Sequence, residues 1–454
     1  MRIEHDSLGA VEIPDNVWWG PQTERSRHNF TTGPKMPMAV IRSLIQVKLA
    51  AALVNGKTGS ISHPISSAIQ QAANQLLALS DDELAQSFPL RVYQTGSGTQ
   101  TNMNVNEVLA HLASQHTDEP VLPNDHVNCG QSSNDTFPTA MHMAGYTAGQ
   151  KVITALNDLI DQFEAKQVAY MHTVKLGRTH LQDATPLTFG QEVSGWVATL
   201  QQDVDTLRAL LPQLLALPLG GTAVGTGLNT TPEQTAQMVQ TIAKLTDTPF
   251  TSMPNKFHGL AAHSELTVNH GALKTLATDL LKIANDIRFL ASGPRGGYGE
   301  LTIPANEPGS SIMPGKVNPT QAEALTMIAT RVLGNDVTIS VANSQGNFEM
   351  NVYKPVIIAS FLESCELLAG GMTQFTHLLV QGLTANEVRM RELVDNSLML
   401  VTALSPHIGY EASAHIAQAA QKNGSSLKAA AIASGKVTEA QYDEWVDPLT
   451  LCNL

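Results

Sequence analysis

Cysteine and positive charge are both scarce in this chain of 454 residues. The three cysteines, Cys129, Cys365 and Cys452, lie far apart and form no C-x-x-C pair, which argues against a disulfide framework and a cysteine-based zinc site. Lysine and arginine number 27 against 40 acidic residues, so the net charge is −13. This charge argues against nucleic acid or an anionic membrane as a partner. An anionic substrate would therefore need a local positive site, because the global field repels it.

Long hydrophobic runs are also missing. No stretch of 18 apolar residues is available to span a bilayer, and the first four residues do not begin a signal peptide. The length of the chain allows about three domains with a large buried core. We therefore expect a cytoplasmic protein that binds neither membrane nor nucleic acid.

Long helical periodicity dominates from about residue 132. Apolar residues recur at spacings of three and four, as at Phe189, Val193 and Trp196. Further long helices are expected over 266–290, 320–341 and 352–380, and a helix in the N-terminal part from Met38 to Asn55, ended by Gly56. Five or more helices of roughly 20 to 30 residues predict an all-α fold built on an elongated bundle.

The length of the expected helices changes along the chain, which suggests three domains. We expect an N-terminal mixed and helical domain over 1–130, a central long-helix bundle over 131–388 and a small C-terminal helical domain over 389–454. Several helices, such as the one covering Leu200 to Leu217, carry more apolar surface than one bundle core needs. This surplus predicts helices that pack between subunits of an oligomer, although a single chain could also bury it.

The longest break in the helical pattern, residues 293–319, contains the most informative motif. Its segment Gly309-Ser-Ser-Ile-Met-Pro-Gly-Lys-Val-Asn-Pro319 combines two hydroxyls, a lysine and an amide. Asn318 is typical of a helix N-cap, and Pro319 of the first helical position. Hydroxyls, a lysine and backbone N–H groups near a helix start can hold a small carboxylate. A solvated connection has the same composition, so this segment alone leaves both interpretations open.

Three further polar segments could bind the same kind of group. The run Gly96–Asn104 lacks the third glycine of a dinucleotide fingerprint and is also typical of a helix-capping turn. Gly130–Asp135 precedes the long helices, and its serines and asparagine are equally typical N-caps. Gly177–Pro186 holds His180, which we expect at the entrance of a helix that starts near Pro186. A histidine there could act as an acid or base near neutral pH.

Glu323 lies one turn into the helix expected to start at Pro319. A carboxylate at this position could orient a histidine and raise its basicity. It could equally serve only the helix, because carboxylates are favoured in a first turn.

Two apparent motifs are incomplete. His263-Ser264-Glu265 matches H-x-E, but no P-C-x-x-C accompanies it, which excludes a deaminase zinc site. Residues 220–226 have the glycine spacing of a phosphate loop but lack its lysine.

The segment 309–319 resembles the signature of the fumarase/aspartase superfamily. Gly315, followed by Thr320-Gln-Ala-Glu323, is similar to the class II fumarases, whereas aspartases typically have alanine at the position of Gly315. The resemblance covers essentially the whole chain, because six further motifs occur in the expected order. They are Asp6–Gly9, Trp19–Thr23, Gly96–Asn106, Ser132–Asn134, Gly177–Pro186 and Gly220–Asn229.

The resemblance implies a metal-free lyase without a cofactor that reversibly hydrates fumarate to L-malate in the tricarboxylic acid cycle. Water would add in the anti sense by acid and base catalysis, through an aci-carboxylate carbanion. The implied fold is mainly helical, with three domains. The implied assembly is a homotetramer with a common core of central helices, in which loops from three subunits meet at each active site.

Motif positions also imply roles for individual residues. His180, paired with Glu323, corresponds to the group that handles the hydroxyl or water, and Ser310 to the base that exchanges the C3 proton. A serine can act so only if loop closure desolvates it and nearby donors stabilise its alkoxide. The carboxylates and the water would be held by Ser97, Gly98, Thr99, Ser132, Ser133, Asn134, Thr179, Ser311, Lys316, Val317 and Asn318.

One segment departs from the family pattern. Members commonly have His-Pro-Asn-Asp at a second, non-catalytic anion site, where this chain has Leu122-Pro123-Asn124-Asp125. Leucine neither donates a hydrogen bond nor carries charge. We therefore predict a weakened or absent second anion site.

The sequence is also compatible with two other functions. One is an ammonia-lyase acting on aspartate, against which Gly315 and the residues 320–323 argue. The other is a catalytically silent oligomeric protein that keeps the fold. Against it, stability alone does not require Ser310, His180 and Lys316 together.

Overall fold

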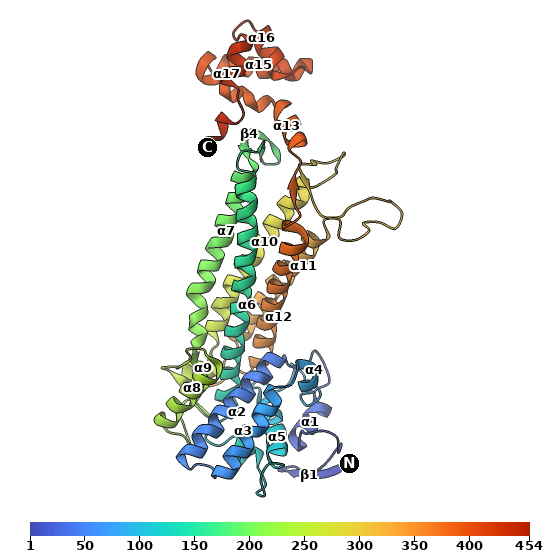
Figure 1. Cartoon of the computed structure of the whole chain (residues 1–454). Helices are drawn as coiled ribbons and strands as arrows, with labels where there is room; N and C mark the ends of the chain where they lie inside the picture. The colour runs from blue at the N-terminus through green and yellow to red at the C-terminus, as the bar shows by residue number, and fades with distance from the viewer. The chain divides into compact units, whose positions relative to one another are not determined.

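The computed structural model describes residues 1–454, and its secondary structure is mainly helical, as predicted (Figure 1). The helices before the long central ones are α1 (Pro21–Asn29), α2 (Met38–Thr58), α3 (His63–Leu77), α4 (Asp81–Leu84) and α5 (Thr99–Ala113). The central ones are α6 (Ser133–Ala169), α7 (Phe189–Leu210), α8 (Pro232–Thr246), α9 (Lys256–Ala261), α10 (Ser264–Leu290), α11 (Thr320–Asn343) and α12 (Lys354–Phe375). The C-terminal ones are α13 (Glu387–Asp395), α14 (Ser405–Ile408), α15 (Tyr410–Asn423), α16 (Leu427–Ala433) and α17 (Glu439–Trp445).

Short strands and tight helical turns complete the fold. The strands form two-stranded sheets: β1 (Arg2–Asp6) with β2 (Gly9–Ile13), β3 (Val174–Thr179) with β4 (Gln182–Thr188), β5 (Ala216–Leu217) with β6 (Thr251–Ser252), and β7 (Leu301–Thr302) with β8 (Thr384–Ala385). Only β5 and β6 are parallel. The π-helical turns are η1 (Pro123–Val127) and η3 (Thr376–Val380), and the 3-10 turns are η2 (Leu211–Leu215), η4 (Leu398–Leu404) and η5 (Thr450–Cys452).

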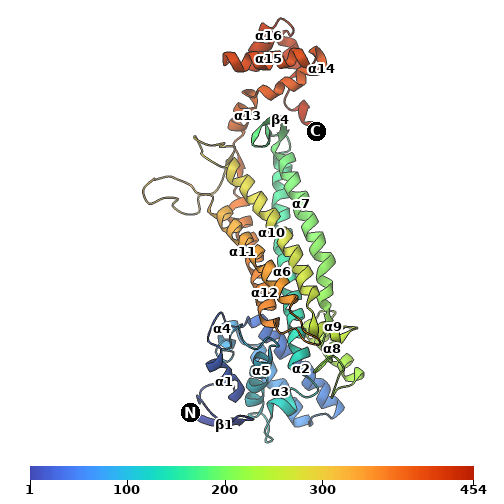
Figure 2. The same ribbon diagram turned by 180° about the vertical axis from the view of Figure 1, so that it is seen from behind.

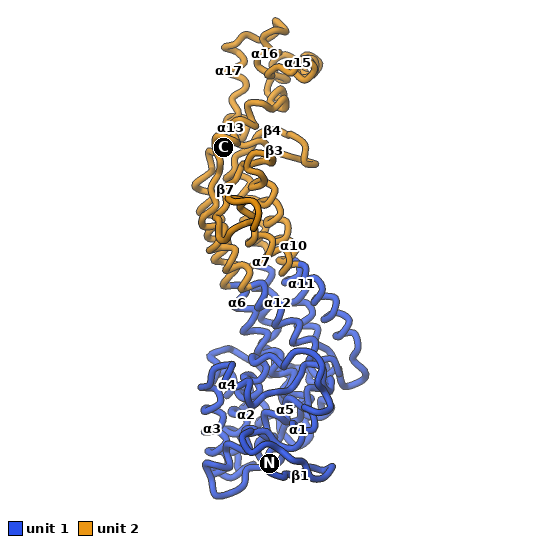
Figure 3. Tube along the Cα trace, turned by 90° about the vertical axis from the view of Figure 1, so that its right-hand side faces the viewer, with its two compact units in different colours: residues 1–153, 205–275, 330–368 blue, residues 154–204, 276–329, 369–454 orange.

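The chain divides into two compact units that alternate along the sequence (Figure 3). Unit 1 comprises residues 1–153, 205–275 and 330–368, and unit 2 comprises residues 154–204, 276–329 and 369–454. Each of the long helices α6, α7, α10, α11 and α12 contributes one segment to each unit. The predicted division into 1–130, 131–388 and 389–454 stays a prediction.

Helix α2 carries one of the apolar cores of unit 1. Its residues Val47, Ala50 and Val54 pack with Met143 of α6 and with residues of α8. The predicted end at Gly56 is wrong, because the helix continues to Thr58 and ends at Gly59, whose φ is 76°. Gly56 instead lies where a Cβ would strike Ser66 of α3, so it permits close helix packing rather than a stop.

The long helices run alongside one another within each unit (Figures 1 and 2). In unit 1, Gly145 of α6 leaves room for Leu214, Leu266 and Phe361, which lie in other elements. In unit 2, aromatic rings pack between α6 and α7, where Trp196 of α7 lies edge-on against Phe163 of α6 with 5.6 Å between the ring centroids. A separate core of unit 2 joins the C-terminal helices to strand β3 through residues such as Leu176, Leu404 and Ile416.

Two helical segments, Met38–Thr58 and Lys354–Val380, are long and apolar enough to cross a membrane by length and composition. In their most apolar windows, 72% and 56% of the residues respectively are buried inside the fold. Burial of this kind is typical of a core helix.

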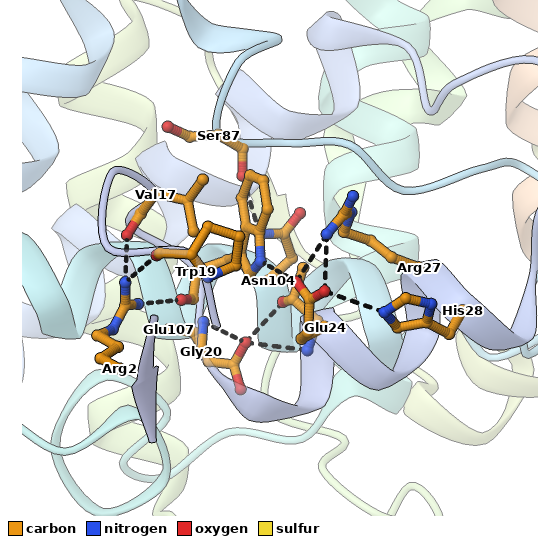
Figure 4. Close-up of polar contacts among 12 residues, drawn as sticks. Arg2, Val17, Trp19, Gly20, Glu24, Arg27, His28, Ser87, Asn104 and Glu107 are labelled. Atoms are coloured by element: carbon orange, nitrogen blue, oxygen red, sulfur yellow. Dashed lines mark hydrogen bonds and ion pairs between the residues drawn. The ribbon is translucent and has the colours of Figure 1, made fainter. Parts of the chain in front are cut away.

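Helix α1 depends on a distant carboxylate at its N-terminus (Figure 4). Its N-cap position, Gly20, has no side chain to accept the free N–H groups of the first turn. Glu107 of α5 takes that role, because its carboxylate accepts from the backbone N–H groups of Gly20 at 3.0 Å, Gln22 at 2.8 Å and Thr23 at 3.1 Å, and from the Thr23 hydroxyl at 2.6 Å. Burial raises the pKa of Glu107, and these four donors oppose that shift.

Glu107→Ala is predicted to lower the free energy of unfolding by about 3 kcal/mol, because it leaves several buried donors without an acceptor. Glu107→Gln retains one acceptor oxygen and should lose less. Urea denaturation measures both variants. The control is Glu83→Ala, which removes the exposed carboxylate that accepts from the Ser80 N–H and hydroxyl at the start of α4. A loss for Glu107→Ala no larger than that of the control would contradict the assignment.

Candidate active site

Two of the predicted substrate loops lie in unit 1 and share a polar network. At the start of α5, the Ser97 and Thr99 hydroxyls are 2.7 Å apart. Gly98, between them, has a φ of 81°, a conformation that glycine adopts without strain. Asn102, one turn into α5, donates to the hydroxyl of Ser133 at 3.1 Å. Helix α5 therefore fixes the first loop relative to the start of α6.

The second loop is anchored by a carboxylate that the sequence analysis did not single out. Ser132 accepts from the Asn134 N–H at 3.2 Å, so it does cap α6. Asp135 accepts from the N–H of Ser132 at 3.0 Å and from those of Gly220 and Thr222 at 2.8 and 3.0 Å. It has no exposed surface. Burial raises its pKa, and the three backbone donors oppose that shift.

The segment with His180 is a β-hairpin, and the predicted helix entrance near Pro186 is wrong. Pro186 lies within β4, and α7 begins at Phe189. His180 and Leu181 form the two-residue turn with φ of 55° and 60°. Positive φ at both central positions matches the right-handed twist of a hairpin. The Thr179 and His180 side chains are exposed at this tip.

Ion pairs hold this hairpin in place. Arg178 donates to the fully buried carboxylate of Glu300 at 2.8 Å. Lys175, also buried, lies 3.1 Å from Glu192 and 3.7 Å from Glu300. Because Glu300 immediately precedes β7, the hairpin is tied to the start of the long connection that carries Ser310.

The connection between α10 and α11 folds back on itself around Ser310. The Ser310 hydroxyl accepts from the backbone N–H groups of Ile312 at 3.2 Å and Met313 at 3.1 Å. The Gly309 N–H donates to the Lys316 carbonyl at 3.1 Å. Ser310 is half-buried, whereas Ser311, Lys316 and Val317 are exposed.

The predicted capping by Asn318 is wrong. Helix α11 begins at Thr320, and the Pro319 carbonyl accepts from the Glu323 N–H at 3.0 Å. The Asn318 side chain instead donates to the Gly309 carbonyl at 2.6 Å. Its amide therefore closes the base of the loop.

A cavity of about 660 Å³ in unit 2 gathers several predicted residues. Lys316, Val317, Asn318 and Glu323 line it together with Arg288 of α10. Two cations and one carboxylate thus line one space that is large enough to hold a small organic acid. No hydrogen bond joins Glu323 to His180 within the chain.

The segment predicted as a weakened second anion site lies at η1. Leu122 is 43% exposed, and Asn124 and Asp125 are exposed. The Leu122 N–H donates to Nδ1 of His126 at 3.0 Å, so a histidine ring lies beside this turn after all. Its position, four residues from Leu122, was not flagged by the sequence motif.

Apart from Ser310 and Ser311, which lie in the loop that Asn318 closes, the structure joins the predicted catalytic and substrate-binding residues in three groups. Ser97 to Thr99 and Ser132 to Asn134 form the first group, in unit 1. Lys316 to Asn318 with Glu323 form the second, and Thr179 with His180 the third, both in unit 2.

Asp135→Asn is predicted to loosen the second loop, because an amide oxygen replaces only part of the carboxylate that accepts three N–H groups. Hydrogen exchange at the Gly220 and Thr222 amides should become about tenfold faster or more. Asp161→Asn, an exposed change on the same helix, is the control. Unchanged exchange in Asp135→Asn would contradict the anchoring role.

Two family models match the chain: one described as a lyase covers residues 9–334, and one described as the fumarase C C-terminus covers residues 400–453. A class II fumarate hydratase of Listeria monocytogenes (serotype 4b, strain F2365) is 54% identical over 459 residues, which cover 100% of both chains. One from Bordetella parapertussis is 52% identical over 460 residues, covering 100% of this chain and 99% of that protein. The crystal structure of a class II fumarase from Schistosoma mansoni is 43% identical with a TM-score of 0.95, covering 99% of both chains.

Proposed function

The chain belongs to the class II fumarate hydratase family of lyases, and from this premise we propose that it reversibly hydrates fumarate to L-malate in the tricarboxylic acid cycle. The full-length similarity to class II fumarate hydratases carries this proposal. The cavity that brings Lys316, Asn318 and Glu323 together supports it. The reaction needs only acid and base groups, and we propose no metal or cofactor for it.

Ser310 is the proposed base at C3. Its hydroxyl oxygen already accepts two backbone N–H bonds, and such donors stabilise an alkoxide more than a hydroxyl. In the dehydration direction, the alkoxide takes the C3 proton of L-malate, and the electrons of that C–H bond form the aci-carboxylate. Lys316 is the proposed cation that stabilises the new negative charge.

His180 is the proposed acid at C2. It delivers a proton to the departing hydroxyl, directly or through a water, so that water leaves as the double bond forms. Glu323 is the proposed partner that orients His180 and stabilises its protonated ring. In hydration, the same groups exchange roles, and His180 receives the proton of the attacking water.

A homotetramer with active sites shared by three subunits is the proposed assembly. Within one chain, Glu323 and His180 are not hydrogen-bonded, and the proposed assembly would bring them together from different subunits. Apolar surface supports association: Val337 and Val341 on α11 are 63% and 55% exposed. With Val352 and Tyr353 they line an apolar groove of about 820 Å³. Exposed patches of this kind mark protein interfaces.

We further propose a cytoplasmic location, with no nucleic acid or membrane as partner. The net charge of −13 supports the second part of this proposal, because it disfavours binding to nucleic acid and to anionic membranes. The three-domain organisation is proposed on family membership. The second anion site is proposed to be weak, because Leu122 offers no polar side chain there.

Absorbance of the fumarate double bond tests the function. It should rise on addition of L-malate and stay constant with L-aspartate. Ser310→Ala and His180→Asn should each lower kcat by about a hundred- to ten-thousandfold, which is the usual contribution of a general acid or base. His415→Asn, an exposed change on α15, should leave kcat unaltered. A rise with L-aspartate, or none with either substrate, would refute the proposal.

Mixing variants tests the shared sites. Ser310→Ala and His180→Asn subunits, coexpressed in equal amounts, should recover about a quarter of wild-type activity, because each site needs one intact residue from each of two subunits. Each variant assembled alone sets the baseline. Activity of the mixed tetramers that does not exceed this baseline would place both residues of a site in one chain.

A further inference from the structure

A lysine with no exposed surface lies directly beneath the two substrate loops of unit 1. Lys354 is the first residue of α12, and its backbone N–H donates to the Gly96 carbonyl at 3.1 Å. Its ammonium donates to the Asn134 carbonyl at 3.5 Å and to the sulfur of Met350 at 2.9 Å. One residue thus contacts the loop that precedes α5, which carries Ser97, and the first turn of α6, which carries Ser133 and Asn134.

The ammonium of Lys354 has fewer acceptors than it can use. An ammonium has three N–H donors, whereas Lys354 has one long bond to a carbonyl and one contact with a thioether, a weak acceptor. No carboxylate lies within ion-pair distance. A buried charge is costly unless it is paired and fully hydrogen-bonded. Lys354 is therefore a cation without its counter-ion.

Lys354 has poorer hydrogen-bond acceptors than the other fully buried lysines. The fully buried lysines are Lys48, Lys175 and Lys354. Lys175 pairs with carboxylates, as such burial requires. Lys48 has no carboxylate partner, but it donates to the side-chain oxygens of Asn128 and Gln131, both at 2.9 Å. Both unpaired lysines thus lie near the start of α6, and Lys354 is the less satisfied of the two.

The groups that face Lys354 do not supply the missing counter-ion. Asp135 attracts it from α6, but its carboxylate is already committed to three backbone N–H groups. His263, just before α10, faces Lys354 with both ring nitrogens unpartnered. Burial first, and then the charge of Lys354, hold the pKa of His263 well below its usual value. A neutral ring adds no negative charge.

We propose that the missing counter-ion is one carboxylate of the substrate, and that Lys354 is the buried positioning residue that sets the affinity of the two loops for it. This proposal rests on the proposed function, because it takes these loops as the place where a dicarboxylate binds. Lys354 acts through the loop backbones and through its charge. A chain with a net charge of −13 needs such a local positive site to attract a dianion.

Burial lowers the pKa of Lys354 to about 7, with the charge of Asp135 opposing the shift. The cation therefore prevails below about pH 7 and is lost as the pH rises through that value. Substrate affinity should fall over the same interval, since the favoured charge pair disappears.

Lys354→Met and Lys354→Arg test the proposal. Methionine removes the charge and keeps the length, so KM for L-malate at about pH 7 should rise about tenfold or more, with a smaller change in kcat. Arginine keeps the charge and should keep KM within about threefold of wild type. The Ki of succinate, a dianion that does not react, should follow KM in both variants.

The pH profile supplies a readout that loss of packing would not change. From about pH 6.5 to about pH 8.5, KM of the wild type should rise, whereas that of Lys354→Arg should stay flatter, because a guanidinium remains charged throughout. A flat wild-type profile, or the same rise in Lys354→Arg as in the wild type, would overturn the proposal. The pH profiles of the wild type and Lys354→Arg test the proposal even if Lys354→Met fails to fold.

Ser364→Ala is the matched control on the same helix. Ser364 is fully buried and contacts His270 at 2.8 Å and Asn335 at 3.1 Å, away from both loops. Its loss should lower the unfolding temperature and leave KM unchanged. A wild-type enzyme that does not turn over L-malate would refute the proposed function. An active wild type with unchanged KM in Lys354→Met would refute only the role of Lys354.

Discussion

The N-terminus of helix α6 is the point on which the polar part of unit 1 depends. Its first N–H groups have no partner within the helix, and Ser132 and Asp135 organise the chain around them. The same Asp135 carboxylate reaches Gly220 and Thr222, which are far away in the sequence. One buried acceptor thus joins two of the polar segments typical of this family. The positions of the Ser133 and Asn134 side chains follow from that constraint.

Much of the helical framework could be predicted from hydrophobic periodicity, because long amphipathic helices give a strong and repeated signal. The predicted start of the N-terminal helix at Met38 is confirmed, because α2 begins at that residue. The hairpin β3–β4 could not be predicted from the sequence. Its turn residues, His180 and Leu181, adopt positive φ without the glycine or asparagine that normally marks such a turn. Propensity cannot indicate a turn that the surrounding ion pairs of Arg178 and Lys175 hold in place.

The sequence indicates which residues belong to the candidate site, but it says less about where they lie relative to one another. The motif order placed Ser310, Lys316 and Glu323 in one functional group, and the structure brings the last two to one cavity. Asn318 was misassigned because the same residue type serves equally as a helix cap and as a loop closure, and only the position of the Gly309 carbonyl decides between them. The proposed pairing of His180 with Glu323 cannot follow from periodicity or spacing, because neither gives a distance between residues far apart in the sequence.

Lys48 and Lys354 were missed for a different reason. Each stands within or beside an apolar helical pattern, where a lysine normally extends its charged end into water. Their burial shows only when the distant loops are packed over them. The negative and positive charges of the chain therefore have different effects on an anion. The abundant carboxylates give the chain a negative charge that repels anions, whereas Lys48 and Lys354, where they are protonated, place positive charge near the starts of α5 and α6. The field of a buried charge is screened less than that of a surface charge, so a protonated lysine here acts more strongly on a nearby anion than an exposed lysine would. An anionic substrate is then attracted at one place on a protein that otherwise repels it.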